Sequence, residues 1–274
     1  MQDVDGVIEG DALTKLRLLP SDFFQCCVTS PPYWRLRDSV VPGQVGLEPT
    51  PEAYIDRLVE IFAEVHRTLR ADGTLWLNLG DTFHQRELLG IPWRVALALR
   101  QSGWSLRSDI VWSKPNPMPE SVTDRPTRSH EFLFLLTKTG RYVYDAEAIK
   151  EDASPNKPWA ERTSSGGAKA LRVRGDGGNR TTMGKPAKDG KRNARSVWTI
   201  PPKHYHGAHD AVFPPELPRR CILAGSREGD VVLDPFAGSG TTLMVAKALR
   251  RHYIGIDLNV DAVVMAEGRI AAGM

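Results

Sequence analysis

A short run near the N-terminus, TSPPYW at residues 29–34, carries groups suited to activating an amine. The lone pair of an exocyclic amine on a nucleobase is delocalised into the ring, so the amine is a poor nucleophile. Acceptors at the Ser30 hydroxyl and the Pro31 carbonyl can bind its two protons, favour a tetrahedral nitrogen and free the lone pair to attack a methyl sulfonium. Pro32 helps to hold these acceptors still, and Tyr33 can stack on a base flipped out of its helix. Taken alone, the run is also typical of a proline-terminated strand with core aromatics.

A second run, DPFAGSGTT at residues 234–242, has the composition of a ligand-binding turn. Gly238 and Gly240 lack a Cβ, so the backbone can turn sharply there and approach a bound nucleoside closely. Ser239 and Thr241 can donate hydrogen bonds to such a ligand. The structural alternative is a tight strand-to-helix turn packed against its own sheet.

The elements around these runs alternate between strand and helix. Residues 231–259 predict one βαβ unit, and Asp257 lies 23 residues after Asp234, where nucleotide-binding units place an acid that accepts the ribose hydroxyls. The rest of the chain predicts strands at 21–30, 74–81, 104–112, 130–138 and 141–148, the last two joined as a hairpin, and helices at 50–73, 91–103 and 213–230. This alternation predicts a parallel, doubly wound α/β sheet that binds ligands at the carboxyl ends of its strands.

The charge of the chain is uneven along its length. The net charge is +3, yet residues 153–196 hold eleven Lys or Arg against three Asp or Glu, an excess of +8 that leaves −5 elsewhere. This stretch is rich in Gly, Ser and Asn and has little apolar periodicity, as in a surface loop. We therefore expect one core with a basic insertion that meets a polyanion.

Several classes of protein and site are excluded by the sequence. No apolar run approaches the roughly 18 residues that a membrane helix needs, and the acidic N-terminus differs from a secretory signal. Two adjacent cysteines and a distant third provide neither a disulfide framework nor a zinc pair, so we expect buried thiols. The irregular spacing of His204, His206 and His209 predicts no metal site. We expect a soluble cytoplasmic protein.

The two runs together resemble the amino-methylating DNA methyltransferases, whose catalytic signature is S/D/N-P-P-Y/F and whose cofactor loop is D-P-F-x-G-x-G-T. A catalytic run that precedes the cofactor loop resembles the β-group of that family. The resemblance implies a Rossmann-like sheet in circularly permuted order, which the chain enters at the third strand and to which it supplies the first two strands last. It divides the chain into a catalytic half at 1–145, a target-recognition insertion at 146–200 and a cofactor-binding half at 201–274.

The resemblance also implies S-adenosylmethionine as cofactor and double-stranded DNA as substrate, and hence association with the nucleoid through DNA. It leaves open the oligomeric state and whether a cognate restriction endonuclease accompanies the enzyme. Gly10-Asp11 resembles the pair that places a carboxylate near the cofactor adenine, and Phe213 resembles a residue beside its methionine moiety. The implied catalytic residues are Ser30, Pro31, Pro32 and Tyr33, and the implied cofactor-binding residues are Asp11, Phe213, Asp234, Phe236, Gly238, Ser239, Gly240, Thr241 and Asp257. The implied DNA contacts are Arg125, Arg128, Lys169, Arg172, Arg174, Arg180, Lys191 and Arg192.

The residue in the first position of the catalytic signature indicates the target atom. Serine, here Ser30, is usual in family members that methylate N4 of cytosine, whereas aspartate or asparagine is commoner in adenine-N6 enzymes. We therefore expect a cytosine-N4 enzyme, with adenine N6 as the alternative. Two more distant alternatives are an enzyme acting on an RNA base or a protein glutamine amide and a DNA-binding protein without activity. The basic insertion opposes a protein substrate, and the intact cofactor run opposes loss of activity.

Overall fold

The computed structural model describes residues 4–36, 41–153, 190–202 and 213–273. Contacts divide the chain into two compact units, one formed by Met1–Asp145 with Arg195–Met274 and the other by Ala146–Ala194. The division expected from the sequence ended the insertion at residue 200, whereas Val197–Thr199 forms a strand of the larger unit. Several residues considered above lie outside the described ranges, namely Lys169, Arg172, Arg174, Arg180, His204, His206 and His209.

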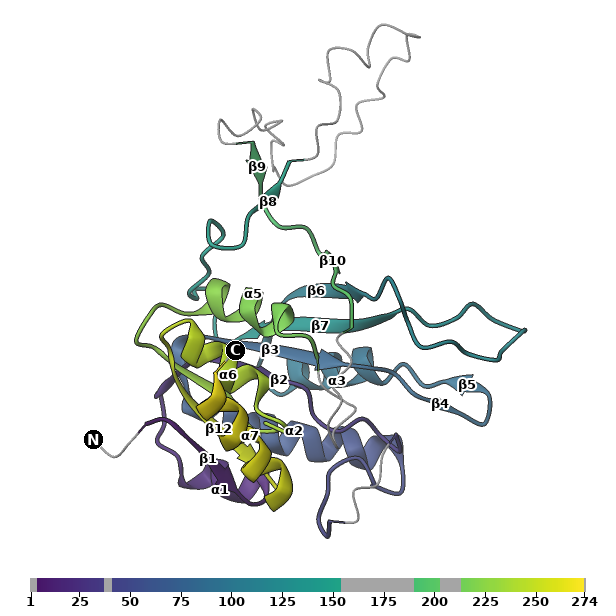
Figure 1. Ribbon diagram of the computed structural model, residues 1–274. Coiled ribbons are helices and arrows are strands. Elements are labelled where there is room, and N and C mark those ends of the chain that lie inside the picture. The colour runs from purple at the N-terminus through teal and green to yellow at the C-terminus, as the bar shows by residue number, and fades with distance from the viewer. Residues whose placement is uncertain (1–3, 37–40, 154–189, 203–212, 274) are drawn as a thin grey trace, which may run out of the picture. The chain divides into compact units, whose positions relative to one another are not determined.

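The larger unit is built on one eight-stranded sheet (Figure 1). In spatial order its strands are β1 (Gly6–Glu9), β12 (His252–Asp257), β11 (Val231–Asp234), β2 (Phe24–Thr29), β3 (Leu69–Leu79), β7 (His130–Thr137), β6 (Ser105–Ser113) and β10 (Val197–Thr199). Strand β7 runs antiparallel to both of its neighbours, and every other neighbouring pair is parallel. The first strand of the chain thus lies beside the last, which confirms the Rossmann-like sheet in permuted order.

Helices cover both faces of this sheet. On one face lie α1 (Ala12–Leu18), α2 (Pro51–Thr68) and α3 (Ile91–Gln101), and on the other lie α5 (Glu216–Gly225), α6 (Thr241–Ala248) and α7 (Val260–Ala272). Successive residues of a strand point to opposite faces. Accordingly, Cys27 of β2 joins the core beneath α1 to α3, whereas Cys26 lies against Gly225 of α5. Both thiols are free and buried, as is Cys221.

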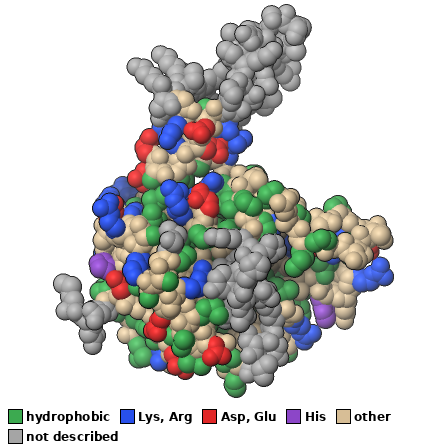
Figure 2. All heavy atoms as spheres, in the orientation of Figure 1, with side chains coloured by type: hydrophobic (Ala, Val, Ile, Leu, Met, Phe, Trp, Pro, Cys, Tyr) green, Lys and Arg blue, Asp and Glu red, His purple; other side chains and the backbone are tan. Residues whose placement is uncertain are grey.

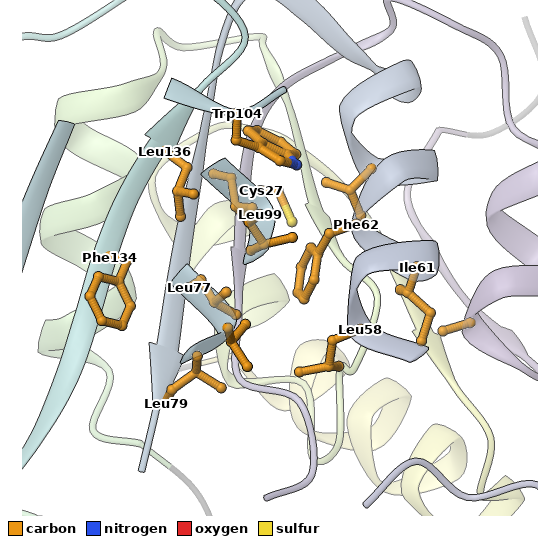
Figure 3. Packing of buried hydrophobic residues seen from close by; sticks show 14 of the residues in the cluster. Cys27, Leu58, Ile61, Phe62, Leu77, Leu79, Leu99, Trp104, Phe134 and Leu136 are labelled. Carbon is orange, nitrogen blue, oxygen red and sulfur yellow. The ribbon is translucent and has the colours of Figure 1, made fainter. Parts of the chain in front are cut away.

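The core under α2 includes Trp34 of the run TSPPYW, and Tyr33 packs against this core. Helix α2 begins at Thr50, whose side chain caps it by accepting from the Ala53 N–H at 3.2 Å. Its apolar stripe packs on the sheet, and Figure 3 shows Leu58 and Phe62 pointing toward Leu77 and Leu79 of β3. Burial of this stripe, rather than helix propensity, is what stabilises the helix.

Helix α2 ends five residues earlier than the glycine at which the sequence predicted its end. Leu69 is already extended, with φ −69° and ψ 146°, and pairs with Phe24 of β2. Strand β3 therefore starts at Leu69 and runs through Gly73, with an irregularity between the partners Phe24 and Cys26. Pairing with a buried strand outweighs the last turn of helix.

The predicted hairpin of residues 130–148 is wrong. Only its first half, β7, is a strand, and β7 lies between β3 and β6, so neither of its edges is free to pair with a following strand. The backbone of the second half bonds elsewhere, from the Val143 N–H to the Asp72 carbonyl at 2.9 Å and from the Asp145 N–H to the Ala224 carbonyl at 2.8 Å.

Two small ladders complete the described strands. In the larger unit β4 (Phe83–His84) pairs with β5 (Glu87–Leu88), and in the smaller unit β8 (Glu151–Asp152) pairs with β9 (Lys191–Arg192). Figure 2 shows acidic and basic side chains interspersed on the visible described surface. Within the described ranges, no helix is long and apolar enough to cross a membrane.

Candidate active site

The two runs singled out in the sequence meet at the carboxyl edge of the sheet. Strands β2 and β11 are parallel neighbours, with Cys26 opposite Val232 and Cys27 opposite Leu233, so both strands end at the same edge. The Thr29 hydroxyl donates to Asp234 Oδ1 at 2.6 Å, which joins residues 205 positions apart. The turn that begins at Ser30 and the glycine turn that begins at Asp234 therefore lie next to each other.

Asp234 is the buried link between these turns. Its Oδ1 also accepts the Phe236 N–H at 3.1 Å, which folds the start of the glycine turn back on the strand. Burial raises the pKa of the Asp234 carboxyl from 3.8 to about 6, and hydrogen bonds from Thr29, Thr242 and the Phe236 backbone limit the rise. Its side chain thus organises the strand end.

The two glycines of the second turn do different work. Gly240 has φ +77° and begins α6, and a Cβ there would lie 2.8 Å from Ala266 Cβ, so this glycine allows α7 to pack closely. Gly238 has φ +50°, and nothing lies within 4 Å of the position of its Cβ. The backbone at Gly238 is therefore open to the close approach of a ligand.

Asp257 closes β12 beside this glycine. Its Oδ2 accepts the Gly238 N–H at 2.7 Å and its Oδ1 accepts the Asn259 N–H at 2.9 Å. Each carboxylate oxygen has a further lone pair, and the side chain is only partly buried. The carboxylate is thus anchored by backbone donors and still able to accept from hydroxyl groups.

Two of the remaining predicted cofactor residues, Asp11 and Phe236, lie at this edge of the sheet. The Gly10 N–H donates to the Asp257 carbonyl at 2.8 Å, which brings the end of β1 to the end of β12, and Asp11 there accepts from the Thr14 N–H at 2.9 Å and from Arg57 Nη2 at 3.1 Å. Phe236 and Phe213 are both partly buried, in the glycine turn and in the segment leading into α5.

Ser239 and Thr241 form hydrogen bonds with another residue of the protein, Arg269. Arg269 Nη1 donates to the Ser239 carbonyl at 2.6 Å, to the Ser239 hydroxyl and to Thr241 Oγ1 at 3.3 Å. Both residues are buried. These contacts tie the turn to α7, and the expected hydrogen bonds to a nucleoside stay a prediction.

On the other side of the meeting point, Ser30 and Tyr33 belong to a hydrogen-bond network. The Ser30 hydroxyl lies 3.2 Å from the Tyr33 hydroxyl, which donates to Glu131 Oε2 at 2.7 Å. Asn78 Nδ2 donates at 2.8 Å to both Tyr33 Oη and Glu131 Oε2 and lies 3.4 Å from Ser30 Oγ. Lys114 Nζ pairs with Glu131 Oε1. Burial, and next the charge of Glu131, raise the pKa of the Tyr33 hydroxyl well above its usual value.

The Tyr33 ring is also held by shape. A Cβ on Gly80 would lie 2.4 Å from Tyr33 Cε2, so only glycine lets the ring rest on the end of β3. The Tyr54 hydroxyl of α2 donates to the Pro32 carbonyl at 2.9 Å, and Pro31 is buried. The turn is therefore fixed from both sides.

Sequence reasoning missed Asn78, Gly80, Lys114 and Glu131. A weak signal exists in two of them, because Asn78 interrupts an apolar strand and Glu131 opens another. A polar residue in such a run predicts a buried partner or an exposed position, but the run does not say which partner. That information comes only from the neighbouring positions of β2, β3 and β7.

The predicted DNA contacts that the structure describes differ in their surroundings. Arg125 pairs with Glu120 at 2.5 Å and stacks over the Phe83 ring at 3.9 Å, while Arg128 Nη1 is buried with no hydrogen-bond partner among the described residues. In the smaller unit, Arg192 Nε pairs with Glu151 at 2.9 Å, and Lys191 precedes it on β9. No group of three His, Cys, Asp or Glu residues in the described ranges could hold a metal ion.

The sequence of the chain is similar to those of several known proteins. The chain is 46% identical to the type II methyltransferase M.XycI of Xanthomonas campestris pv. cyanopsidis and 44% identical to M.Cfr9I of Citrobacter freundii, in both cases over 96% of this chain and 87% of the relative. It is 43% identical to M.SmaI of Serratia marcescens over 96% of this chain and 90% of the relative.

Solved structures agree in fold. TTHA0409 of Thermus thermophilus, in complex with S-adenosyl-L-methionine, superposes with a TM-score of 0.67 at 29% identity, over 98% of this chain and 95% of that one. The cytosine-N4-specific PvuII DNA methyltransferase superposes with a TM-score of 0.71 at 18% identity, over 96% and 85% of the two chains, and so shows the fold alone. A model of the N6 and N4 DNA methylase family matches residues 24–268, and the chain therefore belongs to this family of amino-group DNA methyltransferases.

Proposed function

We propose that this DNA methyltransferase transfers a methyl group from S-adenosylmethionine to N4 of cytosine in a flipped-out nucleotide. The observation that carries the proposal is the Thr29–Asp234 hydrogen bond, which holds the Ser30 turn against the glycine turn. A methyl donor over the glycine turn and an amine beside Ser30 are then neighbours. Such positioning supplies most of the rate of a direct transfer.

The residues at the glycine turn fit the cofactor. Gly238 leaves space where a side chain would stand, and Asp257 offers lone pairs for the ribose hydroxyls from a carboxylate already anchored by backbone donors. Asp11, at the end of the neighbouring strand, has a carboxylate suited to an adenine amino group, and Phe236 supplies an apolar surface beside the turn. When bound, the cofactor supplies an electrophilic methyl group on a sulfonium.

The Ser30 turn fits an aromatic amine. The Ser30 hydroxyl and the Pro31 carbonyl accept hydrogen bonds from the two N–H groups of the amine, and the Tyr33 ring, held in place by Gly80 and Glu131, stacks on the base. These acceptors stabilise the positive charge that develops on nitrogen as the new bond forms. Serine as the acceptor residue favours cytosine, because the family commonly has aspartate or asparagine there for adenine.

We further infer that residues 146–200 read the DNA site. We also infer that a restriction endonuclease of the same specificity accompanies the enzyme, because the relatives are named type II methyltransferases. The excess of +8 in residues 153–196 suits contacts with phosphates. The proposed DNA contacts are Lys169, Arg172, Arg174, Arg180, Lys191, Arg192, Arg125 and Arg128. Affinity for DNA is then expected to fall steeply with salt.

A nucleoside digest of DNA treated with the enzyme and S-adenosylmethionine tests the proposed product. The expected product is N4-methylcytosine, absent when the cofactor is left out. N6-methyladenine without N4-methylcytosine would overturn the choice of base. No methylated base on DNA of varied sequence, together with methylation of RNA or a peptide amide, would overturn the choice of substrate.

A further inference from the structure

The hydrogen bonds behind the Ser30 turn form a chain that starts at a carboxylate. An ionised carboxylate only accepts hydrogen bonds, and the Tyr33 hydroxyl lies 2.7 Å from Glu131 Oε2, so its proton must point at Glu131. A tyrosine hydroxyl has one proton, and the proton of Tyr33 is donated to Glu131. The Tyr33 oxygen can then only accept from its other neighbours.

The next link passes this direction to the serine. Ser30 Oγ lies 3.2 Å from Tyr33 Oη, and since Tyr33 can only accept, the single Ser30 proton is donated to it. The lone pairs of Ser30 Oγ are thereby left for other donors, and the only described donor near them is Asn78 at the long distance of 3.4 Å. A hydroxyl in this state can accept a hydrogen bond from an amine N–H and cannot donate one to the amine.

Asn78 supports the same direction. Its amide nitrogen faces Tyr33 Oη and Glu131 Oε2, both at 2.8 Å, and a flipped amide would set its oxygen against these two oxygens. The orientation leaves Asn78 Oδ1 buried with no hydrogen-bond partner in the described part of the chain. A buried acceptor left unpaired is destabilising, and such an exception is typical of a site held for function rather than stability.

Lys114 completes the arrangement. Its ammonium pairs with Glu131 Oε1 and stacks over the Trp112 ring at 4.4 Å, so the charge of Glu131 is compensated from the side opposite Tyr33. Glu131 is largely buried, with 15% of its side chain exposed. The Glu131 carboxylate thus accepts hydrogen bonds on both oxygens, and these bonds hold it in its orientation toward Tyr33.

We infer that Glu131 is a positioning residue for methyl transfer, which acts through Tyr33 to make the Ser30 hydroxyl an obligate acceptor for the target amine. The inference rests on the proposed function, because it assigns Ser30 to the amine. Glu131 touches neither the cofactor nor the base in this scheme. Its effect is to set the direction of two hydrogen bonds.

The Glu131→Gln variant tests this direction. The Gln amide can donate to Tyr33 Oη, which allows Tyr33 to donate to Ser30 and turns the Ser30 proton toward the amine. We expect kcat to fall by about 10- to 100-fold, the range for a misoriented catalytic group, with KM for DNA and Kd for S-adenosylmethionine within about twofold of wild type. The matched control is Glu64→Gln, which removes a partly buried carboxylate paired with Arg67 at 2.7 Å in α2 and should leave kcat unchanged.

A double-mutant cycle separates a positioning role from a structural one. Tyr33→Phe cuts the chain between Glu131 and Ser30, so adding Glu131→Gln to it should cause no further loss, within about twofold. Additive losses, or a Glu131→Gln enzyme with wild-type kcat, would overturn the inference. Retained cofactor affinity and unchanged thermal unfolding show that each variant is folded.

Failure of the proposed function has a different signature. If the wild-type enzyme produced no methylated base amine, the assignment of Ser30 would fail before any variant was compared. If wild type and Glu131→Gln produced N4-methylcytosine at equal kcat, only the role of Glu131 would fail.

Discussion

The two sides of the candidate site are built in opposite ways. The glycine turn and its acid come from one stretch, Asp234–Asp257, in which a strand, a helix and a second strand follow one another directly. The acceptor side draws Ser30 and Tyr33 from the end of β2, Asn78 from β3, Glu131 from β7 and Lys114 from the loop after β6.

This difference separates backbone from side-chain recognition. The cofactor side works mainly through groups every residue possesses, such as the N–H of Gly238, and through the absence of a Cβ. The acceptor side works through one serine hydroxyl whose proton must point the right way. We therefore expect substitutions on the acceptor side to lower kcat and those on the cofactor side to weaken cofactor binding. Three variants test this contrast, and a fourth, at Asp234, tests the link between the two sides.

The largest effect is expected for Ser30→Ala, which removes the amine acceptor. The rate constant for methyl transfer should fall by about 10²- to 10³-fold, as when one group that stabilises a developing charge is deleted. Affinity for S-adenosylmethionine should be unchanged in calorimetry, and Ser21→Ala, at an exposed serine, serves as control. An equal loss of cofactor affinity would erase the contrast between the two sides.

Gly80→Ala tests the support beneath Tyr33. Because the new Cβ would lie 2.4 Å from Tyr33 Cε2, the ring must move, and a displacement of this size should lower kcat by about 10²-fold. Gly268→Ala in α7, where nothing lies within 4 Å of the added Cβ, is the matched control. Wild-type single-turnover rates for Gly80→Ala would show that the ring position is unimportant.

Asp234→Asn tests the link between the sides by its pH dependence. The folded-state pKa of about 6 exceeds the usual 3.8, so the carboxyl favours the folded state fully below pH about 4, and this contribution is lost as the pH rises through 6. The free energy of unfolding of wild type minus that of Asp234→Asn should therefore fall by about 2–3 kcal/mol between pH 4 and pH 7. Denaturant titrations across this range measure it, and a difference independent of pH would refute the assignment.

The smallest effect is expected for Asp257→Ala, on the cofactor side. Loss of a charged acceptor for the ribose should weaken S-adenosylmethionine binding by at least about tenfold, while kcat at saturating cofactor changes little. Isothermal calorimetry and saturation kinetics give the two quantities. Unchanged affinity would show that the end of β12 does not hold the ribose.

Residues that are close together in the sequence were enough to predict the glycine turn and its acid, and the order of the two runs predicted the order of the sheet. A βαβ unit is local, so its strand, turn and acid have fixed spacing, and Gly238 and Asp257, 19 residues apart, could be expected to meet at one edge of the sheet. The same holds for the Ser-Pro-Pro-Tyr run, whose prolines end a strand wherever it lies. The predicted hairpin at 130–148 is wrong because strand pairing is not local. Both edges of β7 pair with other strands, β3 and β6.

The orientation of the Ser30 hydroxyl could not be predicted from the sequence, because it depends on side chains from distant strands. Glu131 lies 98 residues from Tyr33 and Asn78 lies 48 from Ser30, and no periodicity relates positions that meet through three neighbouring strands. The direction of a hydrogen bond depends on what stands at its far end, and a sequence does not specify which side chain that is until the sheet has assembled.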